Sequence, residues 1–247
     1  MATLRADDPL ATTLVEAIRG GDVARLRRML AEQPELADVR LDDARGGGRT
    51  LLHVATDWPG HFPNGPTAVM ALIDAGADPN APMIGSSHRE TPLHWAASTD
   101  DVEVAEALID RGADLEASGA SIAGGTPLDD AVGYGCWRVA RLLVARGARV
   151  DKPWHAAALG MNARLAELLA GPPAAAPEQI NQAFWHACQG GQPRTAAHLL
   201  ALGADPSWVP PYSKKTALDA AGELDTARQA LIEWLRARGA RSSGQTF

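Results

Sequence analysis

Residues 91–97 read Thr-Pro-Leu-His-Trp-Ala-Ala, and versions of this heptad recur along the chain. Residues 50–55 read Thr-Leu-Leu-His-Val-Ala, residues 126–131 read Thr-Pro-Leu-Asp-Asp-Ala, and residues 216–221 read Thr-Ala-Leu-Asp-Ala-Ala. A second apolar stretch follows each copy and ends in a Gly-Ala pair, and such pairs begin at Gly76, Gly112, Gly147, Gly203 and Gly239. The spacing, about 35 residues with one wider gap, predicts a row of repeated structural units.

The heptad predicts the start of a short helix. Its threonine suits the N-cap position, and a proline suits the first helical position. Small residues such as Ala96 and Ala97 allow a neighbouring helix to approach closely, and glycines such as Gly135 and Gly191 suit the end of a helix. The apolar spacing over residues 102–109 predicts a second, amphipathic helix, so each unit is expected to be a helix pair.

These features resemble the ankyrin repeat, whose period and Thr-Pro-Leu-His-x-Ala signature they share from about residue 11 to residue 240. The resemblance, to a stand-alone bacterial-type ankyrin protein, implies an all-α solenoid of six to seven helix-turn-helix units with β-hairpin loops. We expect a flexible N-terminus at residues 1–10, one ankyrin-repeat domain at 11–240 and a polar tail at 241–247. The units are expected at about 11–38, 47–81, 88–117, 123–151, 152–171, 178–206 and 213–240.

Two proline-rich segments interrupt the pattern. Residues 58–66 hold three prolines and two glycines between the helices of one unit, so we expect them not to be helical. Residues 171–177 are expected to form a loop in place of a normal hairpin.

Composition excludes several classes of protein. The chain of 247 residues is 46% hydrophobic with a formal net charge of −7, which argues against disorder, nucleic-acid binding and attraction to anionic lipid. Two cysteines indicate a reducing compartment, so a cytoplasmic location is expected. We expect no signal peptide and no transmembrane helix, and a capped solenoid is expected to be a monomer.

In the ankyrin family the residue after the signature histidine faces the concave groove. The equivalent residues of the central units are Trp95, Asp130, His155 and His186. Side chains from neighbouring helices could converge on one small ligand, or Asp130, His155 and His186 could act as an acid–base set. The alternative is a set of polar groove residues without such a role.

The resemblance implies a structural role for the signature position itself, through hydrogen bonds to the adjacent turn. His53 and His94 occupy this position, and Asp129 and Asp219 occupy it in two other units.

Aromatic residues supply the remaining site candidates, because seven tryptophans exceed what a plain interaction array needs. Trp58, His61 and Phe62 lie in the insertion and could form a lid or a partner anchor, or could pack on their own repeat. Tyr134 shares a helix face with Asp130, and Trp208 lies in a proline-rich loop where aromatic side chains often make contacts.

No cofactor or metal is expected. Asp130, His155 and His186 are metal ligands by type but lack the spacing of a metal motif. No glycine-rich loop with Lys-Ser or Lys-Thr is present, which argues against nucleotide hydrolysis.

Two functional hypotheses follow. The first is a protein-interaction module, an adaptor or inhibitor, that binds a protein partner in the groove through Trp95, Trp58 and Trp208. The second is a small-molecule binder or enzyme with an acid–base site formed by Trp95, Asp130, His155 and His186. The sequence leaves both open.

Overall fold

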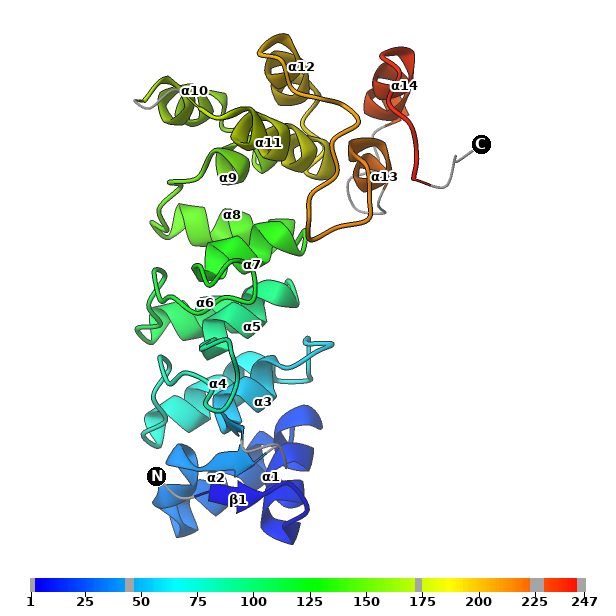
Figure 1. Cartoon of the computed structure of the whole chain (residues 1–247). Coiled ribbons are helices and arrows are strands. Elements are labelled where there is room, and N and C mark those ends of the chain that lie inside the picture. The colour runs from blue at the N-terminus through cyan, green and yellow to red at the C-terminus, as the bar shows by residue number, and fades with distance from the viewer. Residues whose placement is uncertain (1–2, 43–46, 172–174, 223–228, 244–247) are drawn as a thin grey trace. The chain divides into compact units, whose positions relative to one another are not determined.

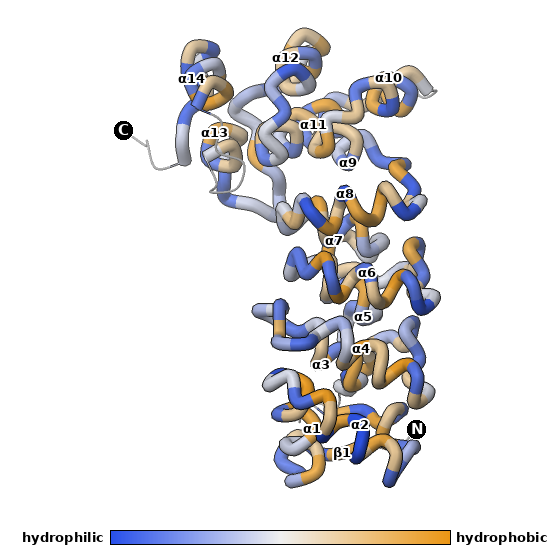
Figure 2. Tube along the Cα trace, turned by 180° about the vertical axis from the view of Figure 1, so that it is seen from behind, coloured by the Kyte–Doolittle hydropathy of each residue, from blue (hydrophilic) through white to orange (hydrophobic). Residues whose placement is uncertain are grey.

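A computed structural model describes residues 3–42, 47–171, 175–222 and 229–243. Within these residues the chain is mostly helical, and its helices form consecutive antiparallel pairs, as the repeats predict (Figure 1). Hydrophobic and hydrophilic residues alternate along the helices, as expected for amphipathic helices (Figure 2). The all-α solenoid architecture is therefore confirmed.

Contacts group the chain into two compact units, residues 1–148 and residues 149–247, which we call the N-terminal and C-terminal units. The elements of the N-terminal unit are β1 (Thr3–Arg5), α1 (Pro9–Arg19), α2 (Val23–Glu32), a 3₁₀ helix (Pro34–Asp38), β2 (Arg40–Asp42), β3 (Gly48–Thr50), α3 (Leu51–Thr56), α4 (Gly65–Asp74), α5 (Pro92–Ser98), α6 (Val102–Asp110), α7 (Pro127–Gly133) and α8 (Trp137–Ala145). Those of the C-terminal unit are α9 (Pro153–Ala158), α10 (Asn162–Ala170), α11 (Pro177–Gln189), α12 (Pro193–Ala201), α13 (Ala217–Ala221) and α14 (Gln229–Ala237).

Two rows of helices build the N-terminal unit. The first helices of the pairs, α1, α3, α5 and α7, pack against one another, and the second helices, α2, α4, α6 and α8, form a parallel row behind them (Figure 1). Fully buried leucines such as Leu52, Leu93 and Leu128 fill the space between successive pairs. Ala96 and Ala97 on α5 are also fully buried, which permits close helix packing.

The signature threonines cap their helices as expected. Thr50, Thr91 and Thr126 each form a capping box with the residue three positions later. This arrangement satisfies backbone N–H groups that a helix start would leave unpaired.

Residues Thr3–Arg5 form a strand, within the segment 1–10 that the sequence predicts to be flexible. Strand β1 pairs in parallel with β2, with Leu4 opposite Leu41, and β2 pairs antiparallel with β3, with Leu41 opposite Arg49. Helix α1 already begins at Pro9. The backbone groups of β2 thus have partners on both sides, a long-range pairing that local sequence does not reveal.

The insertion is shorter than predicted. Residues 57–64 are not helical, but Gly65 and Pro66 form the first turn of α4. A proline at the first turn loses no helical hydrogen bond, since the N–H groups there have no partner within the helix. The prediction of a non-helical segment over 58–66 was wrong for its last two residues.

In the C-terminal unit, α11 packs against both α9 and α13. Of the predicted loop at 171–177, residues 172–174 lie outside the described residues, and Pro177 is the first residue of α11. At the start of the polar tail, the backbone N–H of Ser243 donates to the Asp219 carboxylate (2.9 Å), whereas residues 244–247 lie outside the described residues.

Candidate functional site

The first helices of the pairs, α1, α3, α5 and α7, define what we call the inner-helix side of the N-terminal unit. A hollow of about 240 Å³ opens on this side, and we call it the aromatic pocket. Three aromatic rings line it, together with carboxylates and hydroxyl groups. Its lining residues are Thr56, Asp57, Trp58, Glu90, Trp95, Ser98, Thr99, Ser121 and Tyr134. The pocket thus brings together Trp58, Trp95 and Tyr134, which lie in three different repeats.

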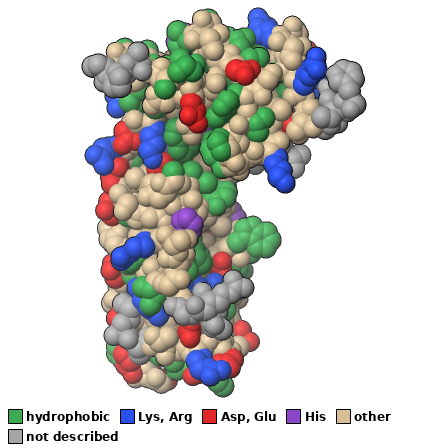
Figure 3. All heavy atoms as spheres, in the orientation of Figure 1, with side chains coloured by type: hydrophobic (Ala, Val, Ile, Leu, Met, Phe, Trp, Pro, Cys, Tyr) green, Lys and Arg blue, Asp and Glu red, His purple; other side chains and the backbone are tan. Residues whose placement is uncertain are grey.

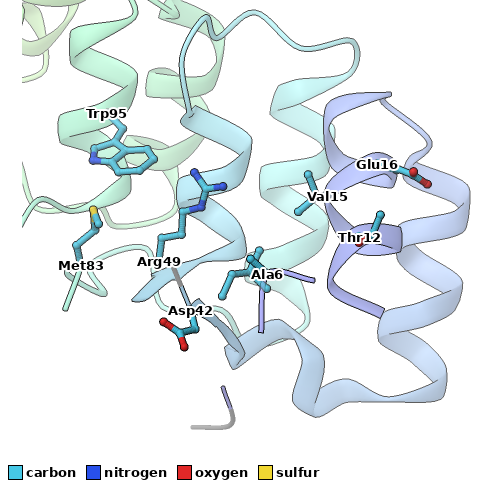
Figure 4. Close-up of a pocket in the computed structure, with 9 residues that line it drawn as sticks. Ala6, Thr12, Val15, Glu16, Asp42, Arg49, Met83 and Trp95 are labelled. Atoms are coloured by element: carbon cyan, nitrogen blue, oxygen red, sulfur yellow. The ribbon is translucent and has the colours of Figure 1, made fainter. Parts of the chain in front are cut away.

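Trp95 also lines a second hollow, of about 480 Å³ (Figure 4). In Figure 4, Trp95 and Met83 stand at one end, Thr12, Val15 and Glu16 of α1 stand at the other, and Arg49 lies between them. Trp95 is therefore a wall shared by both hollows. Its ring also meets the edge of the His53 ring, with centroids 5.0 Å apart.

Hydrogen bonds fix the insertion loop, residues 57–64, to the repeats on either side of it. On one side, Asn64 Nδ2 donates to the Gly21 carbonyl (3.0 Å). On the other side, the backbone N–H of His61 donates to Asp101 Oδ2 (2.7 Å). Phe62 is half-buried beside Arg19, whose guanidinium lies 5.6 Å from the ring centroid. Trp58 nevertheless stays 79% exposed, so a fixed loop presents a large apolar ring to its surroundings.

Asp130 lies behind the pocket wall and is fully buried. Its Oδ1 accepts hydrogen bonds from the Ser121 hydroxyl (3.0 Å) and the Ile122 backbone N–H (3.1 Å). The Ser121 oxygen is also 2.9 Å from the Tyr134 hydroxyl, which positions that half-exposed phenol ring. Asp130 Oδ2 receives no hydrogen bond within the described part of the chain.

Burial raises the pKa of Asp130 to about 7, and the neighbouring Glu90 carboxylate contributes to this increase. Hydrogen bonds from Ile122 and Ser121 act in the opposite direction. Glu90 also accepts a hydrogen bond from Trp95 Nε1 (3.3 Å). The Glu90 carboxylate therefore contacts the Trp95 ring and lies near the buried Asp130 carboxyl group.

The other acid that lines the pocket, Asp57, has basic partners. It forms ion pairs with Arg49 (2.7 Å) and with Arg19. In the described residues, by contrast, no lysine or arginine forms an ion pair with Glu90 or Asp130. The excess negative charge of the pocket therefore lies on its Glu90 side.

The signature residues join the helices to the hairpins. His53 Nε2 is 3.0 Å from the Glu90 carbonyl of the next repeat, and His94 Nε2 is 3.4 Å from the Gly125 carbonyl. Asp129 and Asp219 accept hydrogen bonds from Thr126 and Thr216 at the starts of their helices.

The two histidines that the sequence predicts to face the groove, His155 and His186, lie in the C-terminal unit, and both are buried. The Trp154 ring lies 4.1 Å from His155 and 4.7 Å from His186, centroid to centroid. His186 makes hydrogen bonds to Gln189 (2.9 Å) and to the Tyr212 hydroxyl (3.0 Å). Burial lowers the pKa of His186 to about 3, so this imidazole is neutral near pH 7 and is a poor base.

The remaining candidates are Trp208 and the two cysteines. Trp208 is half-buried in the loop before α13. Burial raises the pKa of the Cys136 thiol to about 12 and that of Cys188 further, which keeps both thiols protonated. No group of three His, Cys, Asp or Glu side chains suits a metal ion among the residues described.

Two surface properties complete the description. The face shown in Figure 3 has Lys and Arg side chains scattered among Asp and Glu side chains. In the part of the chain that the structure describes, no helix combines the length and the apolarity that crossing a bilayer requires.

The repeat geometry agrees with a family comparison. Residues 62–153 match the family model for ankyrin repeats, in three copies. This chain contains ankyrin repeats. Two solved ankyrin repeat domains have similar folds over 91% of the chain: that of human ASB11 (TM-score 0.53, 19% identity, 96% of that chain) and that of Bcl-3 (TM-score 0.51, 25% identity, 97% of that chain).

Curated relatives match over parts of this ankyrin-repeat protein. The "Transient receptor potential cation channel subfamily A member 1 homolog" of Caenorhabditis elegans is 29% identical over 141 residues, 57% of this chain. The "Nuclear factor NF-kappa-B p105 subunit" of Mus musculus is 33% identical over 108 residues, 44% of this chain. In both cases the match covers only 10% of the relative, so the similarity concerns the repeats.

Six residues that line the pocket were not predicted from sequence: Thr56, Asp57, Glu90, Ser98, Thr99 and Ser121. Glu90 directly precedes the Thr-Pro-Leu-His signature, where a hairpin returns to its helix. That position is a signal that could have found it. Ser121 lies in a long hairpin, and nothing in its local sequence indicates contact with Asp130.

Proposed function

We propose that this ankyrin-repeat protein is a protein-interaction module, an adaptor or inhibitor, that binds a partner on the inner-helix side of its N-terminal unit. The observation that carries the proposal is the position of Trp95, which lines two hollows. A partner segment that lies across both hollows would cover this ring. Large, partly exposed aromatic rings at the centre of a surface often dominate binding energy.

Trp58 and Tyr134 also favour this side of the N-terminal unit as the binding surface. They are 79% and 54% exposed and border the hollow that Trp95 closes. An aromatic ring on a fixed backbone loses little conformational freedom on binding, so more of its contact energy contributes to affinity. Trp208 lies in the other unit and is not needed for this proposal.

The alternative is an acid–base enzyme that uses Asp130, His155 and His186. A buried His186 with a pKa of about 3 is neutral and weakly basic at pH 7, and Asp130 is itself fully buried. These properties favour the protein-binding hypothesis over the enzymatic one.

Replacing Trp95 with alanine is expected to weaken binding of the partner at least about tenfold, because a central aromatic anchor is lost. The partner is first captured from a lysate of the source organism on the wild-type protein and identified by mass spectrometry. Its affinity for wild type and for Trp95→Ala is then measured by calorimetry, after circular dichroism has shown that both proteins fold.

Leu202→Ala is the matched control, because Leu202 is an exposed apolar residue at the end of α12 in the other unit. It should bind the partner like wild type. Equal affinities for wild type and Trp95→Ala would contradict the proposal.

A further inference from the structure

We propose that the aromatic pocket accepts an arginine side chain of the protein partner. The inference rests on the proposed function and adds the chemistry that the partner presents to Trp95. It is carried by three features of the pocket: its rings, its uncompensated acid and its size.

The first feature is the set of aromatic walls. Trp58 comes from the insertion loop, Trp95 from α5 and Tyr134 from the end of α7, and all three border one hollow. The faces of such rings carry a negative quadrupole that attracts cations, and indole is the strongest of the three types. Three rings around one hollow favour a cation over an anion.

The second feature is the charge on the Glu90 side. Glu90 lines the pocket and contacts Trp95 Nε1, while Asp130 lies beside it behind Ser121. Arg19 and Arg49 pair with Asp57 and do not pair with Glu90. A cation entering the pocket would therefore meet an acid whose charge is not already compensated by a basic side chain, which makes the interaction favourable in a partly desolvated site.

The third feature is the volume. Pockets for drug-sized ligands range over about 300–1,000 Å³, so a hollow of about 240 Å³ suits one side chain rather than a cofactor or metabolite. A guanidinium group is planar, stacks on indole faces and carries five N–H donors, whereas an ammonium group is a compact and strongly hydrated charge. Walls that combine aromatic rings with the Glu90 carboxylate match the guanidinium group better.

A titration with short peptides tests the inference on the full chain. The probes are acetyl-Gly-Arg-Gly-amide, its lysine analogue and its citrulline analogue, in which a neutral urea replaces the guanidinium group. The indole N–H signals of ¹⁵N-labelled protein report binding, and Trp58→Phe and Trp95→Phe assign the two pocket signals. We expect the arginine peptide to shift both signals saturably, with a dissociation constant at least about fivefold lower than that of either analogue.

Glu90→Gln tests the acidic side, because glutamine keeps the shape and can still accept the hydrogen bond from Trp95. It should weaken binding of the arginine peptide about tenfold through loss of the charge. Glu103→Gln is the control, since it removes the same charge from an exposed position on α6 and should bind like wild type.

Several results would overturn the inference: equal binding of the citrulline peptide, tighter binding of the lysine peptide, or no effect of Glu90→Gln. The captured partner separates this inference from the proposed function. If Trp95→Ala weakens the partner but Glu90→Gln does not, the arginine pocket is wrong and the interaction surface stands. If neither variant affects the partner, both are wrong.

Discussion

Gly190→Ala is expected to destabilise the C-terminal unit by about 3 kcal/mol, because a methyl group there would collide with the backbone of the neighbouring helix. Gly190 ends α11 with ordinary right-handed torsion angles. A Cβ atom would lie 2.1 Å from the Ala158 carbonyl oxygen and 2.9 Å from its carbonyl carbon. Backbone atoms cannot rotate away as a flexible side chain can, so α9 and α11 would have to separate.

Gly222→Ala is the matched control for this substitution. Gly222 also ends a helix of the same unit with right-handed torsion angles, but among the described residues the nearest atom to its Cβ would be the Asp219 carbonyl oxygen at 3.5 Å. The change in stability should be below about 0.5 kcal/mol. Urea denaturation followed by circular dichroism measures both variants, and similar midpoints for the two would show that the packing of α9 on α11 tolerates a methyl group.

Acidification from pH 7 to about 4.5 is expected to destabilise the fold by several kcal/mol, because three histidines are buried as neutral rings. Burial lowers the pKa of His53 to about 3, that of His94 to about 4 and that of His186 to about 3. In the unfolded chain each has a pKa near 6.5. Between these values the unfolded state binds more protons, so stability is complete above pH 6.5 and falls as the pH is lowered.

The size of the effect follows from the same linkage. Two pH units below the unfolded pKa, each histidine accounts for about 3 kcal/mol of lost stability. Asp130 acts in the opposite direction in the N-terminal unit: its raised pKa means that the folded state holds a proton that the unfolded state releases, so its contribution falls as the pH rises from about 4 to 7. This offset is of the size of one histidine, so the net change remains a loss on acidification.

His53 shows why protonation is unfavourable. The backbone N–H of Thr50 donates to Nδ1 (3.2 Å), and Nε2 donates to the Glu90 carbonyl (3.0 Å). A second proton on Nδ1 would face a donor, and the charged ring would be fully buried. His53→Asn is therefore expected to lower stability at pH 7 and to give a shallower dependence on pH.

Urea midpoints measured at half-unit steps from pH 4.5 to 7.5 test this expectation. His198→Asn is the control, because His198 is exposed on α12 and should leave the slope unchanged. A slope for His53→Asn as steep as that of wild type would assign the acid sensitivity to other groups.

Much of the fold could be predicted from sequence because each repeat carries its own local signals. The Thr-Pro start and the closing glycines act over a few residues, so capping at Thr91 and Thr126 follows from the heptad alone. Strand β1 could not be predicted in this way, since its pairing joins Leu4 to Leu41 across two helices. The start of α4 at Gly65 was missed because proline is unfavourable inside a helix but tolerated in its first turn.

The candidate site, too, could be predicted from sequence only in part. Trp95, Asp130 and Tyr134 were predicted from sequence to lie on the inner side, because the repeat phase gives the direction in which a helical residue faces. Trp58 was predicted only as part of an insertion that could form a lid or an anchor or could pack on its own repeat. Which of these residues share one hollow, and that Glu90 and Ser121 complete it, depended on the path of the hairpins and the insertion loop. Hairpin geometry is set by contacts with the next repeat, which a local pattern does not encode.

The sequence by itself determined the repeat, the helix pairs and the inner row of residues, because capping and amphipathic spacing act within one turn or one helix. Only the tertiary structure decided the protonation and exposure of those residues. The same groove position holds a half-buried ring at Trp95, a buried acid at Asp130 and a buried neutral imidazole at His186. The physical reason is that desolvation depends on every element packed around a side chain, and these elements come from separate repeats.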